Sequence, residues 1–189
     1  MHLIFDTETT GLPATRRAPC HPAQPYIMQL GAQLVDDNFQ LVTEVDFLIQ
    51  IPDDVTPDPR AIAVTGITKE MCRGGVTPRQ AHGTLSSLIQ QASHIVAHNL
   101  AFDGKLWEIH CARLGLPNLL LDKHRSQHCT MIMLTNRMRL PGKFRGSFKW
   151  PNLKEAYSFV TGGKTFDGAH DAMADVRAVT EIWRYLQVG

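Results

Sequence analysis

Two carboxylates stand where a buried strand is expected, in the stretch IFDTETTGL from Ile4 to Leu12. Asp6 and Glu8 are two residues apart, so on a strand both side chains point to the same face. A carboxylate in an apolar environment is costly unless a cation accompanies it. The pair therefore predicts a cationic partner supplied from outside the strand.

Two more acids occupy positions that the hydrophobic pattern assigns to the interior. Asp175 lies within the apolar stripe of a helix predicted from about 171 to 186, and Asp103 lies where a predicted strand passes into a helix. Asp175 could pair with Arg113 or Arg177, and Asp103 could simply stabilise a helix start, as Asp171 is expected to do. No run of Lys or Arg is placed to neutralise all the acids. This favours two hard divalent cations, Mg²⁺ or Mn²⁺, held by oxygen ligands as in phosphoryl-transfer sites.

His170 precedes Asp175 by five residues in GAHDAMAD. On a continuous helix this offset separates the two side chains by about 140°, so we expect His170 on the loop that leads into the helix. An unperturbed imidazole pKa near 6.5 suits the removal of a proton from an attacking water. The alternative is a solvent-exposed histidine with no role in chemistry.

The elements that must position these residues follow from periodicity and turn signals. We expect strands over 2–9, 26–35 and 41–49, then a proline-rich stretch of irregular chain or short helical turns. A helix over 77–92, a strand over 94–99, a helix over 102–114 and a fifth strand over 116–122 follow. A capping box opens a helix at Asn152 that stops at Gly162, before the last helix. This order predicts an α/β fold with a mixed sheet.

Composition describes an ordinary globular chain of 189 residues, which we interpret as one domain covering 1–189. The formal net charge is +1, so binding to a polyanion would need a local basic patch. The four cysteines are scattered without a CxxC pair, which favours reduced thiols and a cytoplasmic location. No apolar run is long enough to span a membrane, and no signal-peptide pattern is expected at the start.

Three motifs in this order, FDTETTGL, VAHNLAFD and HDAMAD, resemble the exonuclease motifs of the DEDDh (DnaQ-like) superfamily. This superfamily includes the polymerase III proofreading subunit, ribonuclease T and oligoribonuclease. The resemblance extends from Asp6 to Asp175 and implies a ribonuclease H-like fold, a five-stranded mixed sheet flanked by helices. The implied activity is metal-dependent 3′–5′ exonucleolysis of DNA or RNA, preferably single-stranded, releasing nucleoside 5′-monophosphates.

The resemblance also implies roles for individual residues. Asp6, Glu8, Asp103 and Asp175 would hold two Mg²⁺ or Mn²⁺ ions, and His170 would be the general base. The 3′-terminal nucleotide would lie against the remaining matched positions, which are Thr9, Thr10, Gly11, Leu12, Ile67, Asn99 and Phe102. Leu12 and Ile67 would be apolar wedges, although core packing is their simpler role. The chain departs from the family pattern at Thr65, where relatives often have His, and at Gln29, where many have Glu.

A second feature suited to nucleic acid is the stretch RMRLPGKFRGSFKW from Arg137 to Trp150. It holds five basic residues, no acidic residue and three interleaved aromatic residues. We expect Arg139, Lys143 and Arg145 to contact phosphates, with the aromatic rings stacking on unpaired bases. The alternative is a solvated basic loop whose aromatic rings anchor it to the core.

Two other functions remain open at this stage. The FDTETTG stretch faintly resembles the nucleophile loop of haloacid dehalogenase-type phosphatases, and an inactive nucleic-acid-binding module of the same fold is also conceivable. The expected partners are DNA or RNA 3′ ends, with no membrane, and a homodimer or association with a polymerase stays open. His124, His128 and Cys129 offer at most half of a zinc site.

Overall fold

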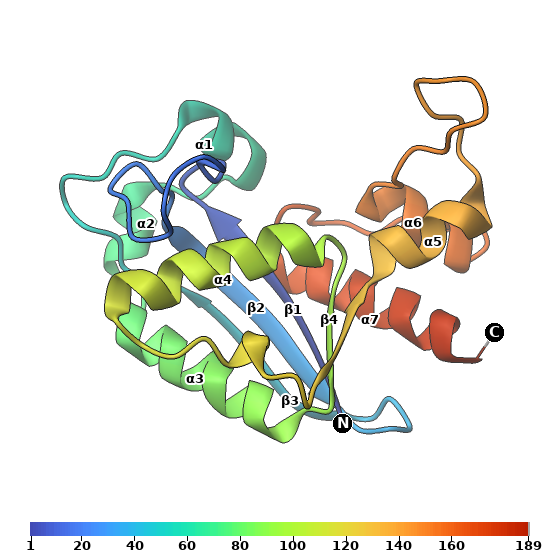
Figure 1. Cartoon of the computed structure of the whole chain (residues 1–189), viewed down its shortest axis with the longest axis horizontal. Helices are drawn as coiled ribbons and strands as arrows, with labels where there is room; N and C mark the ends of the chain where they lie inside the picture. Colours follow the sequence, from blue (N-terminus) through green and yellow to red (C-terminus); the bar gives the residue numbers. More distant parts are fainter. Residues whose placement is uncertain (189) are drawn as a thin grey trace.

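The computed structural model describes residues 1–188 and contains a five-stranded mixed sheet in the order β3-β2-β1-β4-β5 (Figure 1). β1 (His2–Thr9) pairs antiparallel with β2 (Ile27–Val35), which pairs antiparallel with β3 (Leu41–Leu48). On its other edge β1 pairs parallel with β4 (His94–Ala97), and β4 pairs parallel with β5 (Ser126–Cys129). The predicted α/β class and mixed five-stranded sheet are confirmed.

Helices cover both faces of this sheet (Figure 1). α3 (Pro78–Gln91) and α4 (Leu100–Leu114) lie on one face, while α7 (Ala172–Val188) lies on the other beside α5 (Thr130–Met138) and α6 (Leu153–Val160). Two short helices, α1 (Pro59–Thr65) and α2 (Lys69–Arg73), follow β3. Thr77 and Asn152 are the N-caps of α3 and α6, and the predicted capping box at Asn152 is confirmed; Thr77 forms a capping box as well.

The alternation of β1 separates its side chains between two apolar cores. Leu3 and Phe5 belong to the core under α3 and α4, whereas Ile4 belongs to the core under α7. By the same alternation Asp6 and Glu8 lie on the α7 face, and Thr7 lies on the α4 face. The first strand therefore offers its two acids to one helix layer and the threonine between them to the other.

The fifth strand was predicted over 116–122, and this prediction is wrong. Leu119–Leu121 form a short 3₁₀ helix instead, because the Asn118 side chain accepts a hydrogen bond from the backbone of Leu120 and closes a turn. Leu120 is buried in the α3/α4 core, and the apolar run that indicated a strand comes from this packing. The strand beside β4 is β5, four residues that are mostly polar and partly exposed. The sequence analysis also missed α5, whose buried face is formed by Thr130, Met131 and Leu134.

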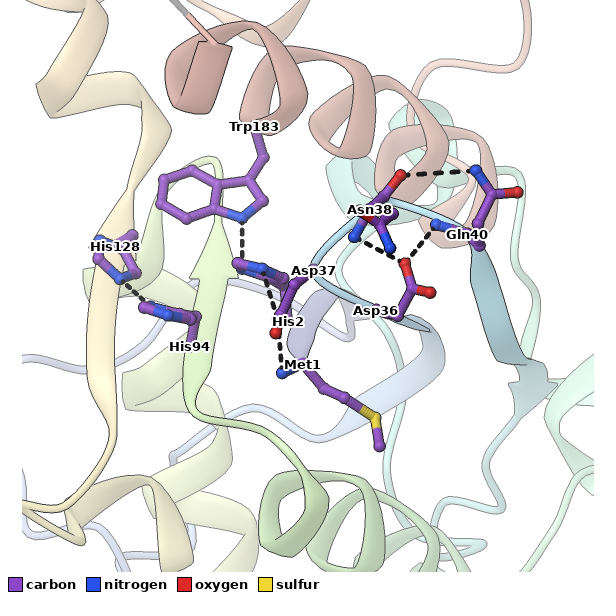
Figure 2. Close-up of polar contacts among 9 residues, drawn as sticks. All are labelled: Met1, His2, Asp36, Asp37, Asn38, Gln40, His94, His128 and Trp183. Carbon is purple, nitrogen blue, oxygen red and sulfur yellow. Dashed lines mark hydrogen bonds and ion pairs between the residues drawn. The ribbon is translucent and has the colours of Figure 1, made fainter.

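The end of the sheet where β1 and β4 begin carries a cluster of histidines (Figure 2). His94 Nδ1 and His128 Nε2 are 3.0 Å apart, and His2 Nδ1 accepts a hydrogen bond of 3.0 Å from Trp183 Nε1. The rings of His2 and His94 are stacked with centroids 4.6 Å apart, and Asp37 lies 3.3 Å from His2 Nε2. His128 is thus part of a stacked, hydrogen-bonded cluster at the end of the sheet opposite to the acids.

Candidate active site

A cavity of about 640 Å³ opens where β1 and β4 end. α1 forms one wall, and the starts of α4 and α7 form the others. Its lining includes all the residues predicted to carry the chemistry, which are Asp6, Glu8, Asp103, His170 and Asp175. Residues from three distant parts of the chain are therefore brought to one cavity.

Asp103 enters this cavity from the α4 layer and is held there by β1. Its Oδ1 accepts hydrogen bonds from the backbone N of Thr7, at 3.2 Å, and from Thr7 Oγ1, at 2.8 Å. Asp103 is buried, and Thr7 points to the α4 face of β1. The threonine between Asp6 and Glu8 therefore fixes the third acid against the first two, a function that the sequence analysis did not assign to it.

His170 and Asp175 enter from the opposite layer, at the start of α7. A carboxylate oxygen of Glu8, a ring nitrogen of His170 and a carboxylate oxygen of Asp175 all lie within 4.8 Å of one another. The backbone N of His170 donates to both carboxylate oxygens of Asp175, at 3.4 and 3.3 Å. His170 is exposed and lies before the helix at a φ of 73°. The predicted loop position of His170 is confirmed.

β2 holds the start of α7 in place. The Gln29 side chain accepts a hydrogen bond from the backbone N of Ala172 and donates to Asp171 and Asp46. At Gly31 a Cβ atom would lie 2.7 Å from the backbone of Ala172, so only glycine permits this approach. Asp171 also accepts from the backbone of Ala174, as expected for a helix-start carboxylate. This contact sets the position from which Asp175 and His170 reach the cavity.

The electrostatics of the cavity follow from burying several acids together. Burial and the neighbouring carboxylates of Asp103, Asp175 and Glu8 raise the pKa of Asp6 well above its ordinary value. Burial and the carboxylates of Asp175, Asp103 and Asp171 raise the pKa of Glu8 to about 8. Burial raises the pKa of Asp103 to about 7, against the opposing hydrogen bonds from Thr7, and that of Asp175 to about 6.

The donor set suits a hard divalent cation. It consists mainly of carboxylate oxygens, and those acids have no salt bridge to Lys or Arg within residues 1–188. Arg177 pairs with Glu44, and Arg113 binds the backbone carbonyls of Gln24 and Pro25, so neither is the partner of Asp175. Within the described residues, no cationic side chain therefore neutralises the ionised form of these acids, and their oxygens fit a divalent cation.

Most residues expected to receive a 3′-terminal nucleotide line the same cavity. These are Thr9, Gly11, Leu12, Asn99 and Phe102. The Leu12 side chain is 81% exposed, which is unusual for an apolar residue in a structured turn and leaves it free to contact a ligand.

The structure does not bring two of the expected residues to this cavity. Thr10 is buried, and its Oγ1 accepts a hydrogen bond from the backbone N of Tyr26, so it joins β1 to the start of β2. Ile67 is 4% exposed and packs with Met28 and Cys72 in a small core. Val64 of α1 is exposed and lines the cavity instead. Short helical turns were one expectation for this stretch, but the place of Val64 in the cavity wall was not predicted.

Arg139, Lys143 and Arg145 do not line the cavity but lie on the segment between α5 and α6. Two lining residues, His98 and Arg60, were also missed by the sequence analysis. His98 is buried next to Asn99, and its ring bonds Thr130 Oγ1 and the carbonyl of Pro151, both at 3.0 Å. A histidine inside the motif VAHN could have been suspected, but its partners are too distant in sequence to be predicted.

The comparison with protein families decides the classification, because an exonuclease family model, RNase_T, matches residues 3–183. The chain belongs to the exonuclease family. Its assignment to the DEDDh type of 3′–5′ exonuclease is thereby confirmed, and the phosphatase hypothesis has no support. Among the part of the chain that the structure describes, no helix combines the length and the apolar character needed to cross a bilayer.

Solved structures of similar fold include several of E. coli exonuclease I. The complex with a dT13 oligonucleotide is 23% identical, with a TM-score of 0.77, over 99% of this chain and 41% of that one. The dA16 complex (23% identical, TM-score 0.76) and the zinc-bound single-stranded DNA complex (23%, 0.74) each cover 98% of this chain and 40% of theirs. This chain thus spans about two fifths of the length of those structures. No curated protein gave a match.

Proposed function

We propose that this exonuclease-family domain removes nucleotides one at a time from the 3′ end of single-stranded DNA or RNA. The observation that carries the proposal is the convergence of Asp6, Glu8, Asp103, Asp175 and His170 on one cavity beside an exposed leucine. The similar structures of E. coli exonuclease I hold single-stranded oligonucleotides, which supports a single strand as the substrate here.

The four acids would hold two divalent ions, Mg²⁺ or Mn²⁺. Such ions, when bound, stabilise the negative charge that develops on a phosphodiester during hydrolysis. Thr7 keeps Asp103 in place for this purpose, and the contact of Gln29 and Gly31 with Ala172 keeps Asp175 in place. A substitution at Thr7, Gln29 or Gly31 that displaces either acid would therefore weaken metal binding, although the acids themselves are unchanged.

In the reaction, water attacks the phosphorus of the last phosphodiester and the bond to the 3′ oxygen of the penultimate nucleotide breaks. We assign the proton of the water to a ring nitrogen of His170, which lies within 4.8 Å of the oxygens of Glu8 and Asp175 that would hold the metal. The departing oxygen takes up a proton and becomes the new 3′ hydroxyl. The product is a nucleoside 5′-monophosphate.

The terminal nucleotide would lie against Leu12 and Phe102, with Val64 as a further apolar lining residue. Gly11 allows close approach of the backbone, and Asn99 offers a polar contact at the cavity edge. Arg60 is the only Lys or Arg side chain among the lining residues, and we assign it to a phosphate of the substrate.

The test is a gel with 5′-labelled single-stranded DNA, single-stranded RNA and a blunt duplex, each with Mg²⁺, Mn²⁺ or EDTA. We expect a descending ladder on the single strands with either metal and no shortening in EDTA. Intact single strands with both metals would overturn the proposal. Shortening of the duplex at the same rate as the single strands would overturn the preference for single strands.

A further inference from the structure

The segment between α5 and α6 forms a defined hairpin, Arg139–Trp150. Lys149 N donates to the carbonyl of Leu140 at 3.0 Å, Gly142 N donates to that of Ser147 at 2.9 Å, and Pro141 and Phe148 pair as an antiparallel bridge. Figure 1 shows the hairpin projecting past α5 and α6, away from the sheet. The segment is therefore a structured projection of the domain.

The hairpin exposes three aromatic rings and unpaired positive charge. Phe144 is 73% exposed, Trp150 66% and Phe148 41%, so these rings do not anchor the hairpin to the core. Within residues 1–188, no carboxylate pairs with Arg139, Lys143 or Arg145; the hairpin's salt bridge runs from Lys149 to Glu155. Large aromatic side chains left uncovered among cations indicate a binding surface.

The outgoing strand of the hairpin is tied to the wall of the candidate active site. Pro151 follows Trp150, and its carbonyl accepts a hydrogen bond of 3.0 Å from His98 Nε2. His98 and Leu153 both line the cavity of the four acids. A single-stranded nucleic acid whose 3′ end lies in that cavity can therefore continue past Leu153 onto the hairpin.

We propose that the Arg139–Trp150 hairpin binds the unpaired strand behind the 3′ end. Phe144, Phe148 and Trp150 stack on its bases while the cations contact its phosphates. Stacking needs bases that are not paired, and it is independent of sequence. The hairpin then makes the enzyme favour long single strands over very short ones. This inference rests on the proposed exonuclease function.

The experiment compares the KM and kcat of a trinucleotide with those of a 15-nucleotide single strand, using Mn²⁺ and the whole chain. For the wild type we expect a lower KM for the 15-mer. In Phe144→Ala/Trp150→Ala this advantage falls by between about 5- and 160-fold for each ring that is lost. In Lys143→Glu/Arg145→Glu the KM advantage of the 15-mer also falls, and log KM depends less on the logarithm of the salt concentration.

The matched control is Arg79→Glu/Lys123→Glu. Both residues are exposed, do not line the cavity and lie outside the hairpin. It should keep the length dependence of the wild type, and circular dichroism should show that all variants are folded. A wild-type KM that is equal for both lengths overturns the inference, as does an equal effect of the control. If wild-type enzyme cleaves neither substrate, the proposed function itself has failed.

An acidic protein partner is the other occupant that such a surface could take. Hairpin variants that keep the wild-type length dependence would favour that occupant and would overturn the strand-binding proposal.

Discussion

Removing one carboxylate from the candidate site should stabilise the metal-free protein while it abolishes activity. Glu8→Gln is the sharpest case, because it preserves shape and removes a group whose pKa is raised from 4.5 to about 8 by burial and by its acidic neighbours. In the unfolded chain this glutamate is ionised at pH 7, whereas in the metal-free folded protein it is protonated. The Glu8 carboxylate therefore binds a proton when the metal-free chain folds at pH 7.

The free-energy cost of protonating Glu8 on folding follows from the difference between pH 7 and the ordinary glutamate pKa of 4.5. At 1.36 kcal/mol per pH unit, this protonation lowers the stability of the metal-free protein by about 3 kcal/mol. The sign is that of a raised carboxyl pKa: stability falls as the pH rises from 4.5 towards 8. In a domain of this size 1 kcal/mol corresponds to about 2–4 °C, so Glu8→Gln should raise the Tm in EDTA by about 6–12 °C at pH 7.

The assay is thermal unfolding in EDTA at pH 7 and pH 8, repeated with excess Mn²⁺. The wild type should be less stable at pH 8 than at pH 7 in EDTA, and Glu8→Gln should depend less on pH. Mn²⁺ should raise the Tm of the wild type, because an ion that binds only the folded state stabilises it. The increase should be smaller for Glu8→Gln.

Glu70→Gln is the matched control, since Glu70 is exposed on α2; its exposed ion pair with Arg73 is worth at most about 1 kcal/mol, so its Tm should equal or lie slightly below that of the wild type. A Glu8→Gln variant that is no more stable than the wild type in EDTA would refute the view that the acids destabilise the metal-free site.

Three further outcomes follow from particular contacts. Gly31→Ala places a Cβ atom 2.7 Å from the backbone of Ala172, so α7 must shift. Thermal melting should show a loss of about 1–3 kcal/mol of stability. Steady-state kinetics should show a kcat that is at least about tenfold lower, because Asp175 and His170 are displaced. Leu12→Ala should raise KM for oligonucleotides without lowering kcat, and an equal loss in both would contradict its assignment to substrate binding. His128 has a pKa lowered by burial and by His94, so its contribution to stability is lost as the pH falls below 6.5. His128→Gln should therefore make the Tm less sensitive to acid between pH 6.5 and 5, and an unchanged slope would argue against this cluster as a source of acid sensitivity.

Much of the site could be predicted because its acids contradict the local hydrophobic pattern. Asp6 and Glu8 share one face of a strand that is otherwise buried, and Asp175 interrupts an apolar helical stripe. Such conflicts between pattern and residue type are readable without coordinates. In the structure these three acids line one cavity.

What could not be predicted depends on contacts between distant residues. The hydrogen bonds from Thr7 to Asp103 join positions 96 residues apart, and a threonine in a strand gives no sign of them. Ile67 resembled a wedge from its motif, but the turn after α1 directs it into a core with Met28 and Cys72. The fifth strand was misplaced because Leu119 and Leu120 are apolar for packing against the core under α3 and α4, whereas the edge strand β5 is polar.

The most direct test of the central claim is the identity of the released product. Wild-type protein and Asp103→Asn should be incubated with Mn²⁺ and a single-stranded oligonucleotide that has a free 3′ hydroxyl, and the products separated by chromatography. We predict nucleoside 5′-monophosphates from the wild type and essentially none from Asp103→Asn. Nucleoside 3′-monophosphates, internal fragments, or equal release by the variant would contradict the account.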